Sequence, residues 1–128
     1  MQNGKCAIAS ELENGYGYGS TEYHVIRTNA KKLSNRYIYC FLRTQIIRKV
    51  AQYYFTGSAG QQRVGADFLE NLVIPLPPLK SDNPNDITQE SIANKIFAIK
   101  EEIKAHRQKT VSLREFAKKQ FEEAVFGG

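Results

Sequence analysis

The chain has 128 residues, of which 41% are hydrophobic and 24% are charged, and it carries a net charge of +5. This composition is typical of one soluble globular domain. No apolar run reaches membrane length, and the first residues lack the basic-then-apolar layout of a signal peptide, so we expect a cytoplasmic protein that binds no membrane.

The positive charge is concentrated in the first part of the chain. Residues 1–80 contain ten Lys and Arg against five Asp and Glu, whereas residues 81–128 contain eight of each kind. An excess of cations on a globular part favours a polyanionic partner such as nucleic acid. Cys6 and Cys40 stand at no metal-ligating spacing, so we expect both to be reduced and at least partly buried.

Two segments near the N-terminus have the composition of strands. Residues 4–9 and 21–28 are rich in β-branched and aromatic side chains, and they flank the glycine-rich residues 14–20. Three glycines in this stretch predict a turn or a flexible loop. A hairpin-like connection is the preferred interpretation; Tyr16 and Tyr18 on such a loop could stack on bases, but nothing in the composition requires it.

A helix is predicted from about residue 35 to residue 54, with Ser34 or Asn35 as its N-cap. On a helical wheel, one broad apolar face is expected in the core: Ile38, Tyr39, Leu42, Ile46, Ile47 and Val50. The opposite face is polar: Thr44, Gln45, Arg48, Lys49 and Gln52. Tyr37 and Phe41 lie at its edge. The polar face is either simply solvated or a surface that lies on phosphates.

Residues 56–63 form a loop by composition, with two glycines followed by two glutamines and Arg63. Gln and Arg side chains pair with adenine and guanine edges, and glycine-rich backbone exposes N–H groups to phosphates. The loop lacks the Gly-Lys-Ser/Thr ending of a nucleotide-binding P-loop. The alternative is a surface connection to the next strand.

Residues 67–74 alternate apolar and polar side chains, which predicts a strand that ends at the proline-rich residues 75–79. A polar linker follows. The predicted organisation is α+β: a small mixed α/β domain at residues 1–80, a linker at 81–88, and one long C-terminal coiled-coil helix at 89–126.

The C-terminal helix carries a continuous seam. No Gly or Pro occurs between Ile87 and Phe126, and Asp86 or Thr88 can act as the N-cap. Steps of four and three residues, the repeat of a coiled coil, run from Ile92 to Ala124, with His106, Thr110 and Gln120 as its polar members. We expect an antiparallel homodimer through residues 90–124, because that arrangement sets large apolar side chains against small ones. Its apolar contacts are Ile92, Ile96, Ile99, Ile103, Leu113, Ala117 and Ala124.

The sequence contains no pattern of catalytic or cofactor-binding residues. His24 and His106 are isolated, no Cys/His cluster could hold zinc, and no dinucleotide-binding glycine fingerprint lies between a strand and a helix. We therefore expect a non-catalytic protein without a metal or cofactor.

Five short strings resemble, in order, the DNA-specificity (S) subunits of type I restriction-modification systems. They are GSTEYHVIR (19–27), YIYCFLR (37–43), GSAGQQRV (57–64), NLVIPLPPL (71–79) and IANKI (92–96). The resemblance implies a target recognition domain followed by a long helix. In that family, two such units lie head to tail with their helices in an antiparallel coiled coil. Each unit reads half of a bipartite site in double-stranded DNA, and the methyltransferase (modification) and restriction subunits supply the chemistry.

This chain has one helix where a full family member has two, and its connector after residue 79 is longer than the family's usual run. It therefore resembles a half-sized or truncated S subunit. Two other interpretations stay open: an assembly element that pairs without reading DNA, and the C-terminal tail of a methyltransferase-specificity fusion.

The candidate DNA contacts form two groups. Four cations are expected on phosphates: Lys31, Lys32, Arg36 and Arg48. Four residues of the glycine-rich loop are expected nearer the bases: Ser58, Gln61, Gln62 and Arg63. The alternative for Arg63 is an ion pair with Asp67 or Glu70.

Overall fold

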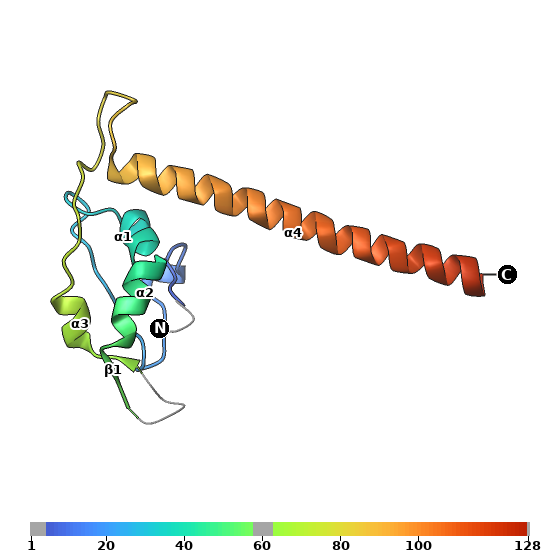
Figure 1. Cartoon of the computed structure of the whole chain (residues 1–128), viewed down its shortest axis with the longest axis horizontal. Helices are drawn as coiled ribbons and strands as arrows, with labels where there is room; N and C mark the ends of the chain where they lie inside the picture. Colours follow the sequence, from blue (N-terminus) through green and yellow to red (C-terminus); the bar gives the residue numbers. More distant parts are fainter. Residues whose placement is uncertain (1–4, 58–62, 128) are drawn as a thin grey trace. The chain divides into compact units, whose positions relative to one another are not determined.

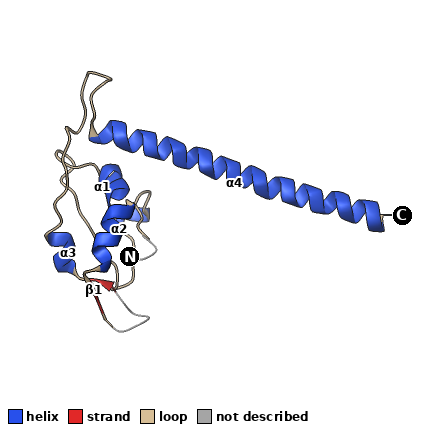
Figure 2. Ribbon diagram, in the orientation of Figure 1, coloured by secondary structure: helices blue, strands red, loops and turns tan. Residues whose placement is uncertain are grey.

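The structure is a computed structural model that describes residues 5–57 and 63–127 (Figures 1 and 2). Its elements, in chain order, are η1 (Glu13–Gly15), α1 (Asn35–Leu42), α2 (Gln45–Gln52), β1 (Phe55–Thr56), β2 (Arg63–Val64), α3 (Ala66–Glu70) and α4 (Gln89–Phe126). The two short strands pair antiparallel, with Phe55 opposite Val64 and Thr56 opposite Arg63. A small sheet with separate helices and one long C-terminal helix confirms the α+β class.

The helix expected at residues 35–54 is two helices, because Thr44 interrupts it. The Thr44 hydroxyl donates to the Phe41 carbonyl at 2.8 Å, and it accepts from the Ile47 N–H at 3.4 Å. The first bond closes the end of α1, and the second caps the start of α2. A threonine side chain that bonds to nearby backbone competes with a continuous helix, so the expectation of one helix was wrong here.

The break also changes which side chains of this region are buried. Tyr37, expected at an edge, is buried, and its hydroxyl donates to the Pro75 carbonyl at 2.8 Å. Burial raises the pKa of this hydroxyl. Ile46, expected in the core, is 74% exposed. A single wheel cannot describe two helices with different axes, and this is why the predicted core face was only partly correct.

The other expected strands are absent from the described residues. Residues 5–9 and 21–28 contain no strand, and residues 67–74 begin within helix α3 before the chain runs on without regular structure. Residues 5–9 and 71–75 do alternate exposed and half-buried positions as strands would. A strand also needs a neighbour to complete its ladder, and in the described part of the chain only β1 and β2 find one.

The core of the globular part is small. It consists of Ala51 from α2, Val64 from β2 and Phe68 from α3, and Phe68 stacks at a tilt against Tyr54 with ring centroids 5.1 Å apart. Four half-buried side chains surround this cluster: Ile47, Phe55, Leu69 and Leu72. Neither Cys6 nor Cys40 is in a disulfide, and both are half-buried, as expected. Burial raises the pKa of the Cys6 thiol, and the Arg43 guanidinium opposes this rise.

Helix α4 begins with a reciprocal cap. The Thr88 hydroxyl accepts from the Ser91 N–H at 3.0 Å, and the Ser91 hydroxyl accepts from the Thr88 N–H at 2.9 Å. The Thr88 carbonyl accepts the first helical bond, from the Ile92 N–H. Thr88 is therefore the N-cap, in the manner of a capping box. Asp86 instead accepts from Ser81 and Asn83 within the preceding loop.

Contacts along the chain divide it into two compact units, Met1–Ala93 and Asn94–Gly128, so the first turn of α4 belongs with the globular part. The boundaries expected at residues 80 and 88 stay a prediction. Among the described residues, no helix is both long and apolar enough to cross a membrane.

Candidate nucleic-acid interface

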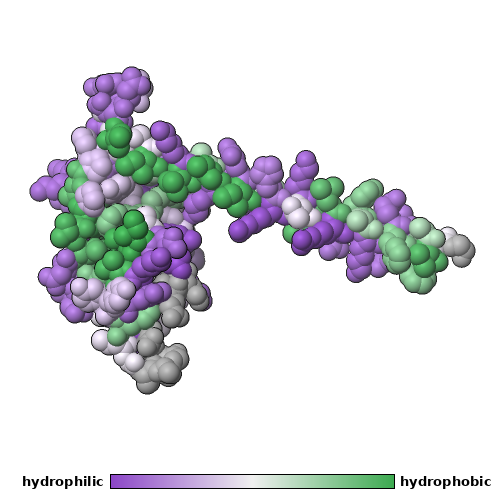
Figure 3. Space-filling model, in the orientation of Figure 1, coloured by the Kyte–Doolittle hydropathy of each residue, from purple (hydrophilic) through white to green (hydrophobic). Residues whose placement is uncertain are grey.

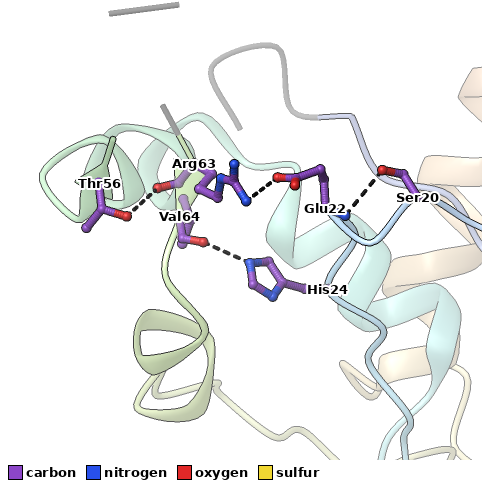
Figure 4. Close-up of polar contacts among 6 residues, drawn as sticks. All are labelled: Ser20, Glu22, His24, Thr56, Arg63 and Val64. Carbon is purple, nitrogen blue, oxygen red and sulfur yellow. Dashed lines mark hydrogen bonds and ion pairs between the residues drawn. The ribbon is translucent and has the colours of Figure 1, made fainter. Parts of the chain in front are cut away.

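Arg63 lies in β2 and points toward the segment that precedes α1. Its guanidinium forms an ion pair with Glu22, and the two side chains are each about half exposed (Figure 4). Beside this pair, His24 Nε2 donates to the Val64 carbonyl at 2.8 Å, and the Glu22 N–H donates to the Ser20 hydroxyl at 3.2 Å. The expected partners of Arg63, Asp67 or Glu70, were therefore wrong. No local pattern indicates an ion pair with a residue that far away in the sequence.

An exposed ion pair of this kind contributes about 0–1 kcal/mol, so it does not commit Arg63 to a structural role. A phosphate or a guanine edge offers a guanidinium the same kind of bidentate hydrogen bonding as a carboxylate does. The other three loop residues expected near the bases lie outside the described residues: Ser58, Gln61 and Gln62. Their contacts stay a prediction.

Three of the expected phosphate contacts lie close together in the chain at the start of α1. Lys31 and Lys32 are exposed in a turn. The Lys31 N–H donates to the side-chain oxygen of Asn29 at 3.1 Å, and the Lys32 N–H donates to the backbone carbonyl of Asn29 at 2.8 Å. Arg36 is exposed in the first turn of α1. The Asn29 turn presents the two lysines to solvent, which suits contacts that position a protein on phosphates.

Arg48, the fourth expected cation, belongs to a different surface. It lines a shallow hollow of about 360 Å³ together with Arg43, Gln45, Lys49 and Gln52. The four α2 residues stand at positions i, i+3, i+4 and i+7, so they share one face of the helix. Arg43, the C-cap of α1, adds a third cation, and its guanidinium also lies 5.2 Å from the Tyr39 ring centroid.

We call these five residues the α2 basic face. It contains three cations and two amides, and no carboxylate of the described residues lines the hollow. Arginine and glutamine are the side chains that bond both phosphates and base edges. The sequence indicated the α2 members of this face, but it did not indicate Arg43, because the bend at Thr44 brings the end of α1 to the same hollow.

Gln89 is a second residue whose role the sequence did not reveal. Its side chain is 1% exposed, although it sits at the start of a helix. It accepts from the Ser34 N–H and donates to the Lys32 and Pro77 carbonyls, each at 2.9 Å. The Gln89 N–H also donates to the Pro78 carbonyl. One side chain thus joins the start of α1, the proline-rich segment and the first turn of α4, all within the globular unit.

The seam of α4 is exposed from Ile96 to Ala124. Ile96, Ile99, Ile103 and Leu113 are between 42% and 57% exposed. Ala117 and Ala124 are also exposed, while Ile92 is half-buried. Figure 3 shows hydrophobic side chains gathered along the first part of α4 and again toward its C-terminal end, with hydrophilic side chains between them. A helix with this much exposed aliphatic surface is typical of one that pairs with another helix.

Within the described residues, no group of three or more His, Cys, Asp or Glu side chains is arranged to hold a metal ion. His24, the one histidine of the globular part, is occupied by its bond to the Val64 carbonyl.

Comparison with known proteins decides the family. Residues 2–114 match the sequence model of the type I restriction modification DNA specificity domain. The chain belongs to this family. It is 42% identical over 80 residues to the Escherichia coli type I restriction enzyme EcoAI specificity subunit, which covers 62% of this chain and 14% of that subunit. It is 39% identical over 78 residues to the EcoEI specificity subunit of the same organism, covering 61% of this chain and 13% of that subunit.

This specificity-domain chain therefore spans about a seventh of the length of the curated relatives it matches. No solved structure matches it.

Proposed function

We propose that this chain is a sequence-specific DNA-recognition module of a type I restriction-modification complex. Its globular part binds one half of a bipartite site in double-stranded DNA. The observation that carries the proposal is the α2 basic face, three cations and two amides with no described carboxylate in its lining, within a chain of the DNA-specificity family. Lys31, Lys32 and Arg36 add phosphate contacts, and Arg63 exchanges Glu22 for the nucleic acid.

Helix α4 serves assembly in this proposal. It pairs antiparallel with a second helix, and a second copy of this chain would supply that helix in the homodimer expected from the seam. The chain itself is non-catalytic. A methyltransferase subunit and a restriction subunit dock on the assembly and are directed to the site by it.

The salt dependence of binding to a labelled duplex tests the DNA-binding part of this proposal. The logarithm of the association constant falls with the logarithm of salt concentration by about 0.9 for each phosphate that the protein neutralises. We therefore expect Arg48→Ala with Lys49→Ala to flatten the slope by about one unit for each phosphate that is no longer neutralised. A matched control is Lys118→Ala with Lys119→Ala, which removes the same charge from α4, where each lysine is ion-paired within the helix.

The same titration separates the proposal from its rival, an assembly element that no longer reads DNA. Salt-independent binding, or an equally flattened slope in the control, would favour the rival, which the exposed seam of α4 also suits.

A further inference from the structure

Part of the exposed surface of α2 is apolar, and the α2 basic face does not include it. Ile46, Val50 and Tyr53 are 74%, 40% and 86% exposed. They stand at positions i, i+4 and i+7, and Tyr53 keeps helical backbone angles at the C-cap, with φ −70° and ψ −16°. The three side chains therefore form one row along the helix, which we call the α2 apolar stripe.

The α2 apolar stripe is not the edge of the core. The residues of α2 that face the core are Ala51, which is fully buried, and Ile47, which packs against the core cluster. With 3.6 residues per turn, the stripe lies about a third of a turn away from these two. Ile46 and Val50 were expected in the core, and the fold leaves both exposed.

The stripe runs beside the exposed polar residues of α2. Gln45, Lys49 and Gln52 are all exposed, and Lys49 lies three residues after Ile46 and four before Tyr53. Lys49 therefore lies between the two glutamines and the stripe on the helix surface. Helix α2 contains no Asp or Glu. Its exposed surface thus has a cationic and amide side and an apolar side, with the lysine at the junction.

This combination matches the major groove of double-stranded DNA. An apolar row on an exposed surface is typical of an interaction site. The adjoining cation and amides, without a carboxylate on the helix, are complementary to a polyanion. In the major groove an A·T pair presents the adenine edge, which glutamine bonds, beside the C5-methyl group of thymine, which apolar side chains contact. In RNA the corresponding groove is too narrow for side chains to read, and uracil has no methyl group.

The size of α2 also suits this groove. The helix has eight residues, so it is about 12 Å long. The major groove is about 12 Å wide and admits an α-helix. At about 3.4 Å for each base pair, α2 spans roughly three or four base pairs, a length over which the stripe and the glutamines reach the same A·T pairs.

We propose that α2 lies in the major groove and that the α2 apolar stripe reads the methyl groups of thymine. Ile46 and Tyr53, the two most exposed members, make the contacts, while Gln45 and Gln52 bond the paired adenines and Lys49 a phosphate. This inference rests on the DNA-binding role in the proposed function, and it specifies A·T pairs as the bases that α2 recognises.

The probe is a duplex that the wild-type chain selects from a randomised pool, prepared once with thymine and once with deoxyuridine in its place. Deoxyuridine pairs with adenine in the same way and lacks only the methyl group. We expect the wild type to bind the thymine duplex about fourfold more tightly for each methyl group contacted. This ratio should persist at high salt, where both affinities fall, because the contact is apolar.

Two variants, Ile46→Ala and Tyr53→Ala, each remove one apolar side chain from the stripe, and each should lower the thymine preference toward one. Both residues are exposed, so both variants should fold, which circular dichroism and urea unfolding check. Val73→Ala is the matched control, since Val73 is 87% exposed outside α2 and should leave the preference unchanged. Any effect of deoxyuridine on the shape of the duplex would persist in all three variants.

Two results would overturn the inference: equal affinity of the wild type for the two duplexes, or a full thymine preference in both stripe variants. Either result together with salt-dependent DNA binding rejects this inference alone, and the stripe would then be a contact for another protein surface. If the wild type bound no duplex even at low salt, the proposed function would fail with it.

Discussion

The globular unit and α4 are stabilised in opposite ways. The globular unit depends on contacts between distant segments: Gln89 bonds to backbone 55 and 57 residues away, and His24 bonds to backbone 40 residues away. Helix α4 depends on bonds between residues four apart, and most of its side chains stay exposed. One region is therefore specified by its tertiary contacts, and the other by its local sequence, which leaves an apolar seam exposed.

The largest contrast is expected from truncating a phenylalanine in each region. Phe68 is 6% exposed in the core, and Phe116 is 61% exposed on α4. Phe68→Ala should lower the free energy of unfolding by about 3–4 kcal/mol, because it removes buried apolar surface and leaves a cavity. Phe116→Ala should change it by less than about 0.5 kcal/mol. All seven tyrosines lie in the globular part, so tyrosine fluorescence during urea unfolding measures that part alone. Equal effects of the two changes would contradict the contrast.

The next largest effect is expected at Gln89. Gln89→Ala leaves the Ser34 N–H and the Lys32 and Pro77 carbonyls without their partner, at a cost of about 2–3 kcal/mol in the free energy of unfolding. Gln120→Ala is the control, since Gln120 is exposed and its side chain donates to Glu123 of the same helix. Tyrosine fluorescence during urea unfolding measures the stability of both variants. If both variants unfolded at the wild-type urea concentration, the bonds of Gln89 to distant backbone would not stabilise the globular unit.

Ile99→Asp should affect association rather than folding. Ile99 is 52% exposed, so the lone chain keeps its helix and its urea midpoint. A carboxylate in the seam removes about 1.5–3 kcal/mol of apolar burial from each chain in the pair. Sedimentation should show weaker self-association of the variant than of the wild type. Lys104→Asp, outside the seam, is the control, and unchanged sedimentation of the Ile99 variant would show that the seam is not the pairing surface.

The smallest effect is expected at the Arg63–Glu22 pair. If Arg63 exchanges Glu22 for DNA, Arg63→Ala should weaken binding to the preferred duplex by about 1 kcal/mol. Glu22→Gln should strengthen it slightly, because it removes a competing carboxylate. Neither change should alter stability by more than about 1 kcal/mol. Opposite shifts in a fluorescence anisotropy titration identify a DNA contact, and two unchanged curves identify a structural ion pair.

Much of the fold and little of the interface could be predicted from the sequence. The long helix and the half-buried cysteines without a disulfide were predicted correctly, and Thr88 is one of the two N-caps that the sequence allowed. The strands at residues 5–9 and 21–28 were not, because β-branched residues favour extended backbone but cannot supply a neighbouring strand. The helix at residues 35–54 was predicted as one because the two bonds of Thr44 depend on its rotamer, which composition does not reveal.

The candidate DNA-binding site also has one part that the sequence predicted and one part that it did not. The polar face of α2 is a local pattern, and the sequence predicted it. The contribution of Arg43 to that face and the pairing of Arg63 with Glu22 depend on how separate segments meet. Side-chain partners chosen by nearness in the sequence, such as Asp67 for Arg63, are a poor guide where the chain bends.

The sequence by itself determined the family, through five short strings in order, and α4, through an uninterrupted seam with a cap at its start. It did so because helical hydrogen bonds and heptad spacing relate residues only a few positions apart. Only the tertiary structure decided that Gln89 is buried, that Thr44 splits a helix and that Arg63 has an acidic neighbour from before α1. A buried polar group is stable only with its partners, and those partners came from segments that no local pattern connects.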